Sequence, residues 1–175
     1  MDELEAGLET IRNAPKSEGT LELIVRRPQV GARETLDEGR LDVDEGLVGD
    51  RWKTRRSANP DTQLNIMNTR VIALVAQDKD RWPLAGDQLF IDLDLSTENV
   101  PPGTRLAIGS AIVEVTAEPH TGCAKFMSRF GLDATHFVNS PLGRELQLRG
   151  VNAKVVQSGV IRVGDVAKKA GADGA

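Results

Sequence analysis

The sequence predicts a single, mainly β domain of the α+β kind, in which short strands form a barrel or sandwich beside a few short helices. Short runs that are apolar, or that alternate apolar and polar residues, recur along the chain between turn residues. Aromatic residues make up only 3% of the chain and Tyr is absent, so Val, Leu, Ile and Ala must build the core. The length of 175 residues suits one domain with a sizeable core. The predicted strands are residues 20–26, 62–67, 71–75, 89–93, 105–108, 111–117, 151–156 and 160–163.

Turns and helices divide the second half of the chain. Gly109-Ser110 lies between two predicted strands and favours a tight hairpin. Residues 123–130 place apolar side chains at helical spacing, and Gly131 provides a stop for that helix. Residues 140–149 predict a second helix, since a Ser-Pro pair suits its first turn. Residues 133–138 predict a further turn of helix between the two.

The chain divides into three parts. Residues 1–19 form an N-terminal helical arm, because leucine and isoleucine recur at helical spacing and Asp2 with Glu5 has the pattern of a capping box. Residues 20–167 form the domain itself. Residues 168–175 are rich in Gly, Ala and Lys, and we expect them to form a flexible C-terminal tail.

Composition excludes several classes of function. The net charge of −4 and the scarcity of aromatic residues argue against a nucleic-acid partner. No apolar run reaches the roughly 18 residues that a membrane helix needs, and the acidic N-terminus is unlike a signal peptide, so we expect a cytoplasmic protein. One cysteine and two histidines give neither an internal disulfide nor the ligand set of a zinc site or iron–sulfur cluster.

The single cysteine, Cys123, is the main candidate for chemistry. It follows a Pro- and Gly-containing loop and stands where a helix begins, with His120, Lys125 and Arg129 nearby in sequence. Unpaired backbone N–H groups and neighbouring cations lower the pKa of a thiol, and the thiolate is the form that attacks electrophiles or binds soft metals. The alternative is a small buried hydrophobic residue, because Cys123 shares its helical spacing with apolar neighbours.

Other polar residues lie in glycine-rich or loop segments. Asp50 and Arg51 follow a segment with two glycines, where an arginine fork can face an anion, although a solvated ion pair in a turn is the alternative. Asn99 lies in a loop before Pro101, and Asn152 lies on a predicted strand; both are equally compatible with ordinary exposed positions.

Taken together, these segments resemble the MOSC family, named for the C-terminal domain of molybdenum cofactor sulfurase. The resemblance runs from about Gly46 to Asp165 and rests on the order and spacing of several motifs. Trp52 stands where the family usually has His, and the cysteine loop lacks the Arg and Pro that many members show. The matching segments are Gly-Leu-Val-Gly-Asp-Arg at 46–51, Glu-Asn at 98–99 with Gly-Thr-Arg-Leu-Ala-Ile-Gly at 103–109, the strand and loop at 111–123, and residues 149–153 and 159–165.

The resemblance implies a β-barrel-like fold with a few short helices, and a link to molybdenum and sulfur chemistry. Members are thought to bind molybdenum cofactor, or to carry sulfur as a cysteine persulfide toward metal–sulfur centres. On this basis Cys123 holds the persulfide or ligates molybdenum. The residues expected to recognise the anionic pterin phosphate or to orient the sulfur are Asp50, Arg51, Asn99, His120, Lys125 and Asn152.

Three functions stay open at this point. The first is cofactor binding or sulfur carriage, with a cysteine desulfurase as the sulfur donor; the family is also associated with pyridoxal phosphate binding. The second is a molybdenum-dependent reductase of N-hydroxylated compounds, which needs a separate reductase as electron donor. The third is a non-catalytic interaction module that uses the barrel and the N-terminal helix. The oligomeric state is not indicated by the sequence.

Overall fold

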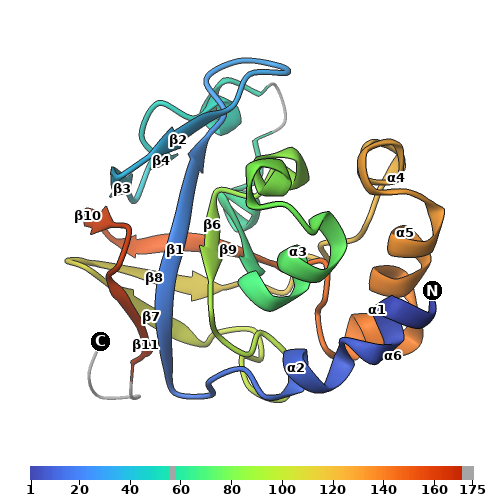
Figure 1. Ribbon diagram of the computed structural model, residues 1–175. Helices are drawn as coiled ribbons and strands as arrows, with labels where there is room; N and C mark the ends of the chain where they lie inside the picture. Colours follow the sequence, from blue (N-terminus) through green and yellow to red (C-terminus); the bar gives the residue numbers. More distant parts are fainter. Residues whose placement is uncertain (56–57, 171–175) are drawn as a thin grey trace.

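A seven-stranded mixed β-barrel forms the centre of the computed structural model, which describes residues 1–55 and 58–170 (Figure 1). The strand order is β11-β7-β8-β9-β5-β6-β1, and pairing of β1 with β11 closes the barrel. Strands β5 and β6 run parallel, whereas the other neighbouring pairs are antiparallel. The barrel strands are β1 (Glu18–Arg26), β5 (Leu64–Asn68), β6 (Leu89–Ile91), β7 (Arg105–Ile108), β8 (Ala111–Val115), β9 (Val151–Gln157) and β11 (Val166–Lys169).

Four further strands lie outside this barrel. Strand β2 (Glu34–Leu36) pairs with the end of β1. A separate three-stranded sheet has the order β10 (Gly159–Arg162), β3 (Glu38–Asp42) and β4 (Gly46–Leu47). The sequence analysis missed β2, β3, β4 and β11, because these strands are short and rich in charged or glycine residues.

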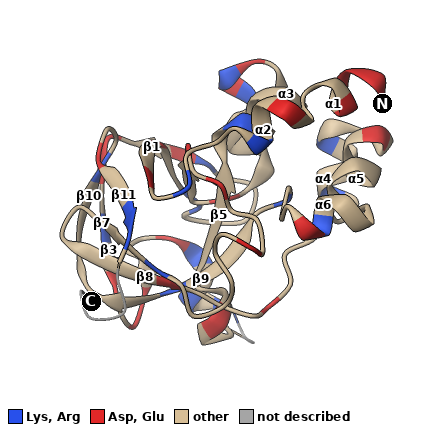
Figure 2. Cartoon of the chain, turned by 90° about the horizontal axis from the view of Figure 1, so that it is seen from below, with Lys and Arg blue, Asp and Glu red and all other residues tan. Residues whose placement is uncertain are grey.

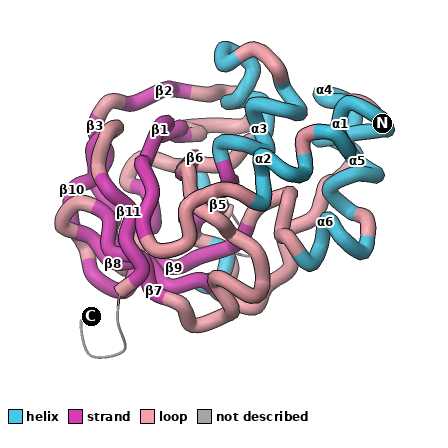
Figure 3. The backbone as a smooth tube through the Cα atoms, turned by 60° about the horizontal axis from the view of Figure 1, so that its bottom comes forward, coloured by secondary structure: helices cyan, strands magenta, loops and turns pink. Residues whose placement is uncertain are grey.

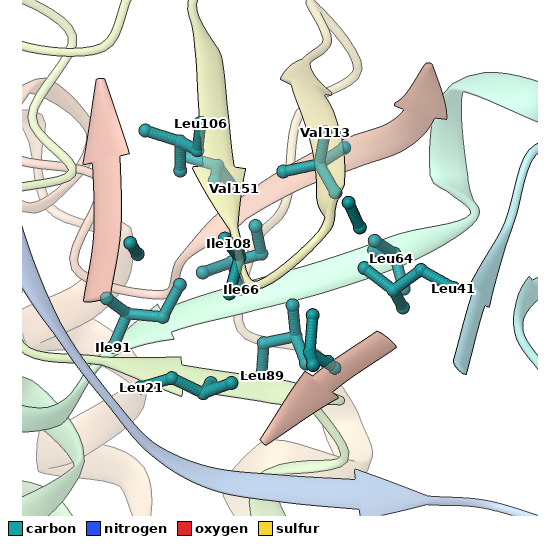
Figure 4. Packing of buried hydrophobic residues seen from close by; sticks show 14 of the residues in the cluster. Leu21, Leu41, Leu64, Ile66, Leu89, Ile91, Leu106, Ile108, Val113 and Val151 are labelled. Carbon is teal, nitrogen blue, oxygen red and sulfur yellow. The ribbon is translucent and has the colours of Figure 1, made fainter. Parts of the chain in front are cut away.

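The interior of the barrel is a packed core of aliphatic side chains (Figure 4). Leu106 and Ile108 of β7 are fully buried and alternate with more exposed neighbours, as expected for a strand with one face toward the core. Burial of each such side chain contributes about 1.5–3 kcal/mol of hydrophobic free energy. The prediction of a core without tyrosine and dominated by Val, Leu, Ile and Ala is confirmed.

A second hydrophobic cluster joins the outside of the barrel to the helices, which gather on one side of the molecule (Figure 3). Strand β1 contributes to both clusters, because Ile24 faces the interior while Leu23 and Val25 face the helices. The helices are α1 (Asp2–Ala6), α2 (Leu8–Arg12), α3 (Thr69–Ala76), α4 (Ala124–Phe130), α5 (Leu132–Asn139) and α6 (Pro141–Glu145), with 3-10 turns η1 (Arg51–Thr54), η2 (Pro60–Thr62) and η3 (Lys79–Ala85).

One predicted strand is wrong, since residues 71–75 lie in helix α3. The side chain of Asn68 accepts a hydrogen bond from the N–H of Arg70 (2.9 Å) and caps this helix. A buried apolar run of this length has no periodicity that separates strand from helix, and the cap outweighs the β preference of the valines.

The helix predictions in the second half of the chain are confirmed in position but not in length. Helix α4 follows Cys123 and ends at Gly131, as expected. Helix α6 is shorter than residues 140–149, although Ser140 caps it as predicted by accepting from the N–H of Gly143 (2.9 Å). Gly109 has a positive φ of 55° in the hairpin between β7 and β8.

The termini differ in detail from the predictions. The N-terminal arm contains two short helices, and no side-chain capping bond forms at Asp2, so the predicted capping box is wrong. Lys168 and Lys169, assigned by the sequence to the tail, belong to β11, and residues 171–175 lie outside the described residues. Charged residues of both signs are spread over the barrel and the helices (Figure 2). None of the helices in the described part of the chain has the length and hydropathy to span a membrane.

Candidate functional site

A cavity of about 380 Å³ lies where β1 ends and β9 begins. The loop that follows β1, seen at the top of Figure 1, forms one part of its wall, and helix α4 forms another. Among the described residues, the wall contains six arginines and one lysine but no Asp or Glu. Since the whole chain has a net charge of −4, positive charge is concentrated in this cavity. The lining residues are Arg27, Val30, Gly31, Arg33, Arg51, Arg55, Thr62, Asn65, Ala85, Gly86, His120, Thr121, Cys123, Lys125, Phe126, Arg129, Arg149 and Asn152.

Cys123 lies in the wall as the residue immediately before α4, and it is exposed. Partial burial raises the pKa of the thiol, but the backbone N–H groups of Phe126 and Lys125 and the charge of Arg149 outweigh this effect, so the pKa of Cys123 lies below its ordinary value. A thiol with these neighbours is more ionised near neutral pH than an ordinary cysteine. The alternative of a buried hydrophobic cysteine is therefore wrong.

Two asparagines fix the loop that carries the thiol. Asn139 at the end of α5 accepts a hydrogen bond from the N–H of Gly122 (2.8 Å) and donates one to its carbonyl oxygen (2.9 Å). Asn152 donates to the carbonyl oxygens of Glu118 (3.0 Å) and Pro119 (3.2 Å). The two amide side chains hold the backbone on both sides of His120, so the position of Cys123 does not depend on α4 alone.

A buried group of three charged or polar side chains lies behind the thiol. Asp87, whose side chain is fully buried, accepts a hydrogen bond from Nη1 of Arg149 (2.6 Å) and lies 3.3 Å from Nε2 of His120. Arg149 also stacks on the ring of Phe126, with 5.0 Å between the guanidinium carbon and the ring centroid. Gly150 has a φ of 117°, and a Cβ there would lie 2.4 Å from the carbonyl oxygen of Ile66. Only glycine fits this close approach.

This arrangement shifts the pKa of two of its members. Burial raises the pKa of Asp87, but Arg149 and His120 outweigh that effect, so the pKa of Asp87 is lowered and its carboxylate stays charged. Burial and the charge of Arg149 lower the pKa of His120 despite the opposing effect of Asp87. His120 is therefore neutral near pH 7, with a ring able to donate one hydrogen bond and accept another.

A second buried ion pair supports the other side of the cavity. Asp50 accepts hydrogen bonds from the backbone N–H of Arg27 (2.8 Å) and from its guanidinium at Nε (3.0 Å) and Nη2 (2.9 Å). It also accepts from the N–H of Trp52 (3.1 Å) and so caps η1. Burial raises the pKa of Asp50, but the bonds from Arg27 prevail and lower it. Asp50 orients Arg27 toward the cavity and does not itself line it.

Five of the predicted site residues come together in this cavity, and two do not. The five are Arg51, His120, Cys123, Lys125 and Asn152. Asp50 lies behind the wall, as described above. Asn99 lies elsewhere, where it donates to the carbonyl oxygens of Asp94 and Lys16 and accepts from Lys169, so its hydrogen bonds tie the loop after β6 to the N-terminal arm and β11.

Several important residues were missed by the sequence analysis. Arg27, Arg33, Arg55, Asp87 and Arg149 are separated along the chain and meet only in the folded barrel. The sequence carries one signal for Asp87, because it lies two residues before the buried apolar strand β6 and a polar residue there needs a buried partner. Arg27, which lies between the end of β1 and Pro28, is a weaker signal of the same kind.

The donor atoms in the cavity suit an anion and a soft metal. Nε of Arg51 and Nε of Arg149 are buried and have no hydrogen-bond partner. Buried donors without partners are rare, and an anionic ligand would satisfy them. Within residues 1–55 and 58–170, no three His, Cys, Asp or Glu side chains cluster as a metal site. A metal at Cys123 would therefore have one protein ligand, with the others supplied by a cofactor.

Comparison with known proteins identifies the family. The MOSC domain model matches residues 53–168. Three crystal structures share the fold at low identity. YuaD from Bacillus subtilis has a TM-score of 0.60 and 16% identity, covering 86% of this chain and 96% of its own. YiiM from Escherichia coli has a TM-score of 0.57 and 20% identity, covering 87% and 70%. YiiM from Geobacillus stearothermophilus has a TM-score of 0.53 and 15% identity, covering 92% and 77%.

No curated protein matches the sequence. The family match covers most of the chain, including the cysteine loop, the two asparagines that bind its backbone and the buried Asp87–Arg149 pair. The barrel and the short helices agree with the fold expected from the sequence motifs. The chain belongs to the MOSC domain family.

Proposed function

We propose that this protein binds molybdenum cofactor in the cationic cavity, with Cys123 as the sulfur ligand to the metal. The observation that carries the proposal is an exposed thiol of lowered pKa in a wall where the described part of the chain contributes seven cations and no acid. Membership of the MOSC family supports the same cofactor.

The residues present fit the cofactor's phosphate and its metal. A phosphate monoester carries about −1.5 to −2 charges at pH 7 and offers three acceptor oxygens. Arg51 and Arg149 each have a buried Nε without a partner, and Lys125 lies beside the thiol in the same wall. We propose that Arg51 and Lys125 hold the phosphate, and that the thiolate of Cys123 serves as the soft metal ligand. When bound, the cofactor supplies a redox-active metal that exchanges oxygen or sulfur with a substrate.

The chain's own residues prepare the site for that ligand. The backbone N–H groups and Arg149 stabilise the thiolate of Cys123 and lower the pKa of the thiol, which favours loss of its proton to solvent. Asp87 keeps Arg149 in place, and neutral His120 offers a ring nitrogen that can take or give a proton beside the cavity. Reduction of N-hydroxylated compounds would use this same site and would need electrons from a separate reductase.

Sulfur carriage is a second candidate, favoured by the exposure of Cys123. In that reaction the Cys123 thiolate attacks the outer sulfur of a persulfide on a cysteine desulfurase. The new S–S bond forms on Cys123, and the S–S bond of the donor breaks to leave the donor's thiolate, so electrons balance without an added oxidant. A thiolate that is exposed and of low pKa meets the requirements of this attack.

Purification from a host that makes molybdenum cofactor tests the proposal. We expect molybdenum and pterin in about equal amounts with the wild-type protein, loss of molybdenum in Cys123→Ser, and loss of both in Arg51→Gln. Arg105→Gln is the matched control, since Arg105 lies on β7 and pairs with Glu114 (3.2 Å) away from the cavity. Pterin that is absent from the wild type, or unchanged in Arg51→Gln, would contradict cofactor binding.

Mass spectrometry of the same samples separates the two candidates. A mass gain of one sulfur on Cys123 after incubation with a desulfurase and cysteine supports carriage. Pyridoxal phosphate is the other phosphate cofactor expected for the family. The absorbance spectrum of the same preparation shows whether it is bound.

A further inference from the structure

Six of the seven cations of the cavity fall into an inner and an outer set, and Arg51, already assigned to the cofactor's phosphate, is counted in neither. Arg27 and Arg149 are buried and each pairs with a buried carboxylate, Asp50 or Asp87. Four others, the outer set, are partly or fully exposed: Arg33, Arg55, Lys125 and Arg129. Within residues 1–55 and 58–170, no carboxylate forms an ion pair with any of the outer four.

Backbone carbonyl groups hold two of the outer arginines together. Nε of Arg33 donates to the carbonyl oxygen of Pro83 (3.1 Å), and Nη1 of Arg129 donates to the carbonyl oxygen of the next residue, Leu84 (2.9 Å). Neighbouring carbonyls of η3 thus fix two guanidinium groups that come from distant parts of the chain. Carbonyl oxygens orient these groups but do not neutralise their charge.

The arginines are crowded enough to perturb one another. Burial lowers the pKa of Arg33, and the charges of Arg129, Arg27 and Arg51 lower it further. Burial also lowers the pKa of Arg55, with additional effects from Arg27 and Arg51. Like charges held together repel, and an anion among them relieves that repulsion. One phosphate monoester, with about −1.5 to −2 charges, leaves much of this charge without a counterion.

We infer that the small molecule that approaches Cys123 is itself an anion, whose carboxylate or phosphate is bound by an outer subsite formed by Arg33, Arg55 and Arg129. This inference deepens the proposed function by naming the substrate class, and it rests on that function only in assigning Arg51 and Lys125 to the cofactor's phosphate. The outer subsite recognises the anionic group of the substrate, and the thiol end of the cavity receives its reactive part.

Two alkylating reagents of similar size test the inference on the protein as purified. Iodoacetate is an anion and iodoacetamide is neutral, and each adds a mass tag to Cys123, the single cysteine of the chain. The ratio of their second-order rate constants cancels the effect of the thiol pKa, because both reagents attack the same thiolate. We expect this ratio to exceed that of N-acetylcysteine by about tenfold at low salt and to fall as salt screens the charges.

Substitutions localise the effect. We expect Arg33→Gln combined with Arg129→Gln to lower the ratio by at least about threefold, and Arg105→Gln to leave it unchanged. Arg55→Gln, at an exposed position, provides a single substitution with the same expected direction. A ratio equal to that of N-acetylcysteine, or one insensitive to all three outer arginines, would overturn the subsite.

Protection experiments identify the anionic group. The two anions are compared at equal ionic strength. If inorganic pyrophosphate slows iodoacetate labelling more than citrate does, the substrate carries a phosphate. If citrate slows labelling more, the substrate carries a carboxylate. Protection by neither anion would count against the subsite. Because these measurements need no cofactor, an elevated rate ratio in a protein that fails to retain pterin would reject the proposed cofactor and leave the subsite standing.

Discussion

Replacing the buried carboxylate of Asp87 by an amide is expected to lower stability while making Cys123 more acidic. Asp87 is fully buried and contacts Nη1 of Arg149 at 2.6 Å and Nε2 of His120 at 3.3 Å. Removing one partner of a buried ion pair typically costs about 3–5 kcal/mol, and because Asn keeps the shape and one acceptor oxygen we expect about 3 kcal/mol. The charge of Arg149 then acts on the thiol without a counterion, so the pKa of Cys123 falls further.

Urea unfolding and alkylation rates measure the two effects. With a urea dependence of about 2 kcal/mol per M, the unfolding midpoint of Asp87→Asn should fall by about 1.5 M without a change in slope. The matched control is Asp92→Asn, since Asp92 pairs with Arg70 (2.8 Å) at a partly exposed position and should lose no more than about 1 kcal/mol. Equal losses in the two variants, or a raised thiol pKa in Asp87→Asn, would refute the reasoning.

Three further predictions follow from the same contacts. Asn139→Ala removes both hydrogen bonds to Gly122, and it should cost about 1–3 kcal/mol in urea unfolding and alter the alkylation rate of Cys123; an unchanged rate would contradict the role given to that amide. Gly150→Ala places a methyl group 2.4 Å from the carbonyl oxygen of Ile66, so we expect little folded protein by circular dichroism, and a normal thermal transition would disprove the close approach. Because the pKa of His120 is lowered in the folded state, the unfolded chain binds more protons below about pH 6.5, and the protein becomes less stable as the pH is lowered through that range. His120→Gln should reduce this dependence of the unfolding free energy on pH, and an unaltered dependence would rule out His120 as its source.

The barrel was predictable because its strands carry local signals. Hairpin turns such as Gly109-Ser110, and the alternation of buried and more exposed residues in β7, depend only on neighbours in sequence. Residues 71–75 could not be assigned correctly in the same way, since a short buried helix and a buried strand share the same apolar composition. Strands β2 to β4 carry little hydrophobic signal in the sequence. They are strands because they pair with neighbouring strands in the folded protein.

The candidate site was predictable only around the cysteine. The loop before α4 has Pro, Gly, His and Cys within a few residues, so a reactive thiol there can be predicted from the sequence. Arg149 and Asp87 are 62 positions apart, and nothing local connects them. Asn99 was assigned to the site because it lies within a family-like motif, but its side chain donates hydrogen bonds that join the loop after β6 to the N-terminal arm. Cations assembled from distant segments become visible only once the fold is known.

The acidity of the Cys123 thiol tests the central claim most directly. Iodoacetamide labelling of the single cysteine, followed by mass spectrometry from pH 5 to 10, yields its pKa, with the unfolded chain in urea as the reference. The backbone N–H groups at the start of α4 and the charge of Arg149 predict that the pKa of Cys123 is lower in the folded protein than in the unfolded chain. A folded-state pKa equal to or above that of the unfolded chain would contradict the account of the cavity as a site built around a thiolate.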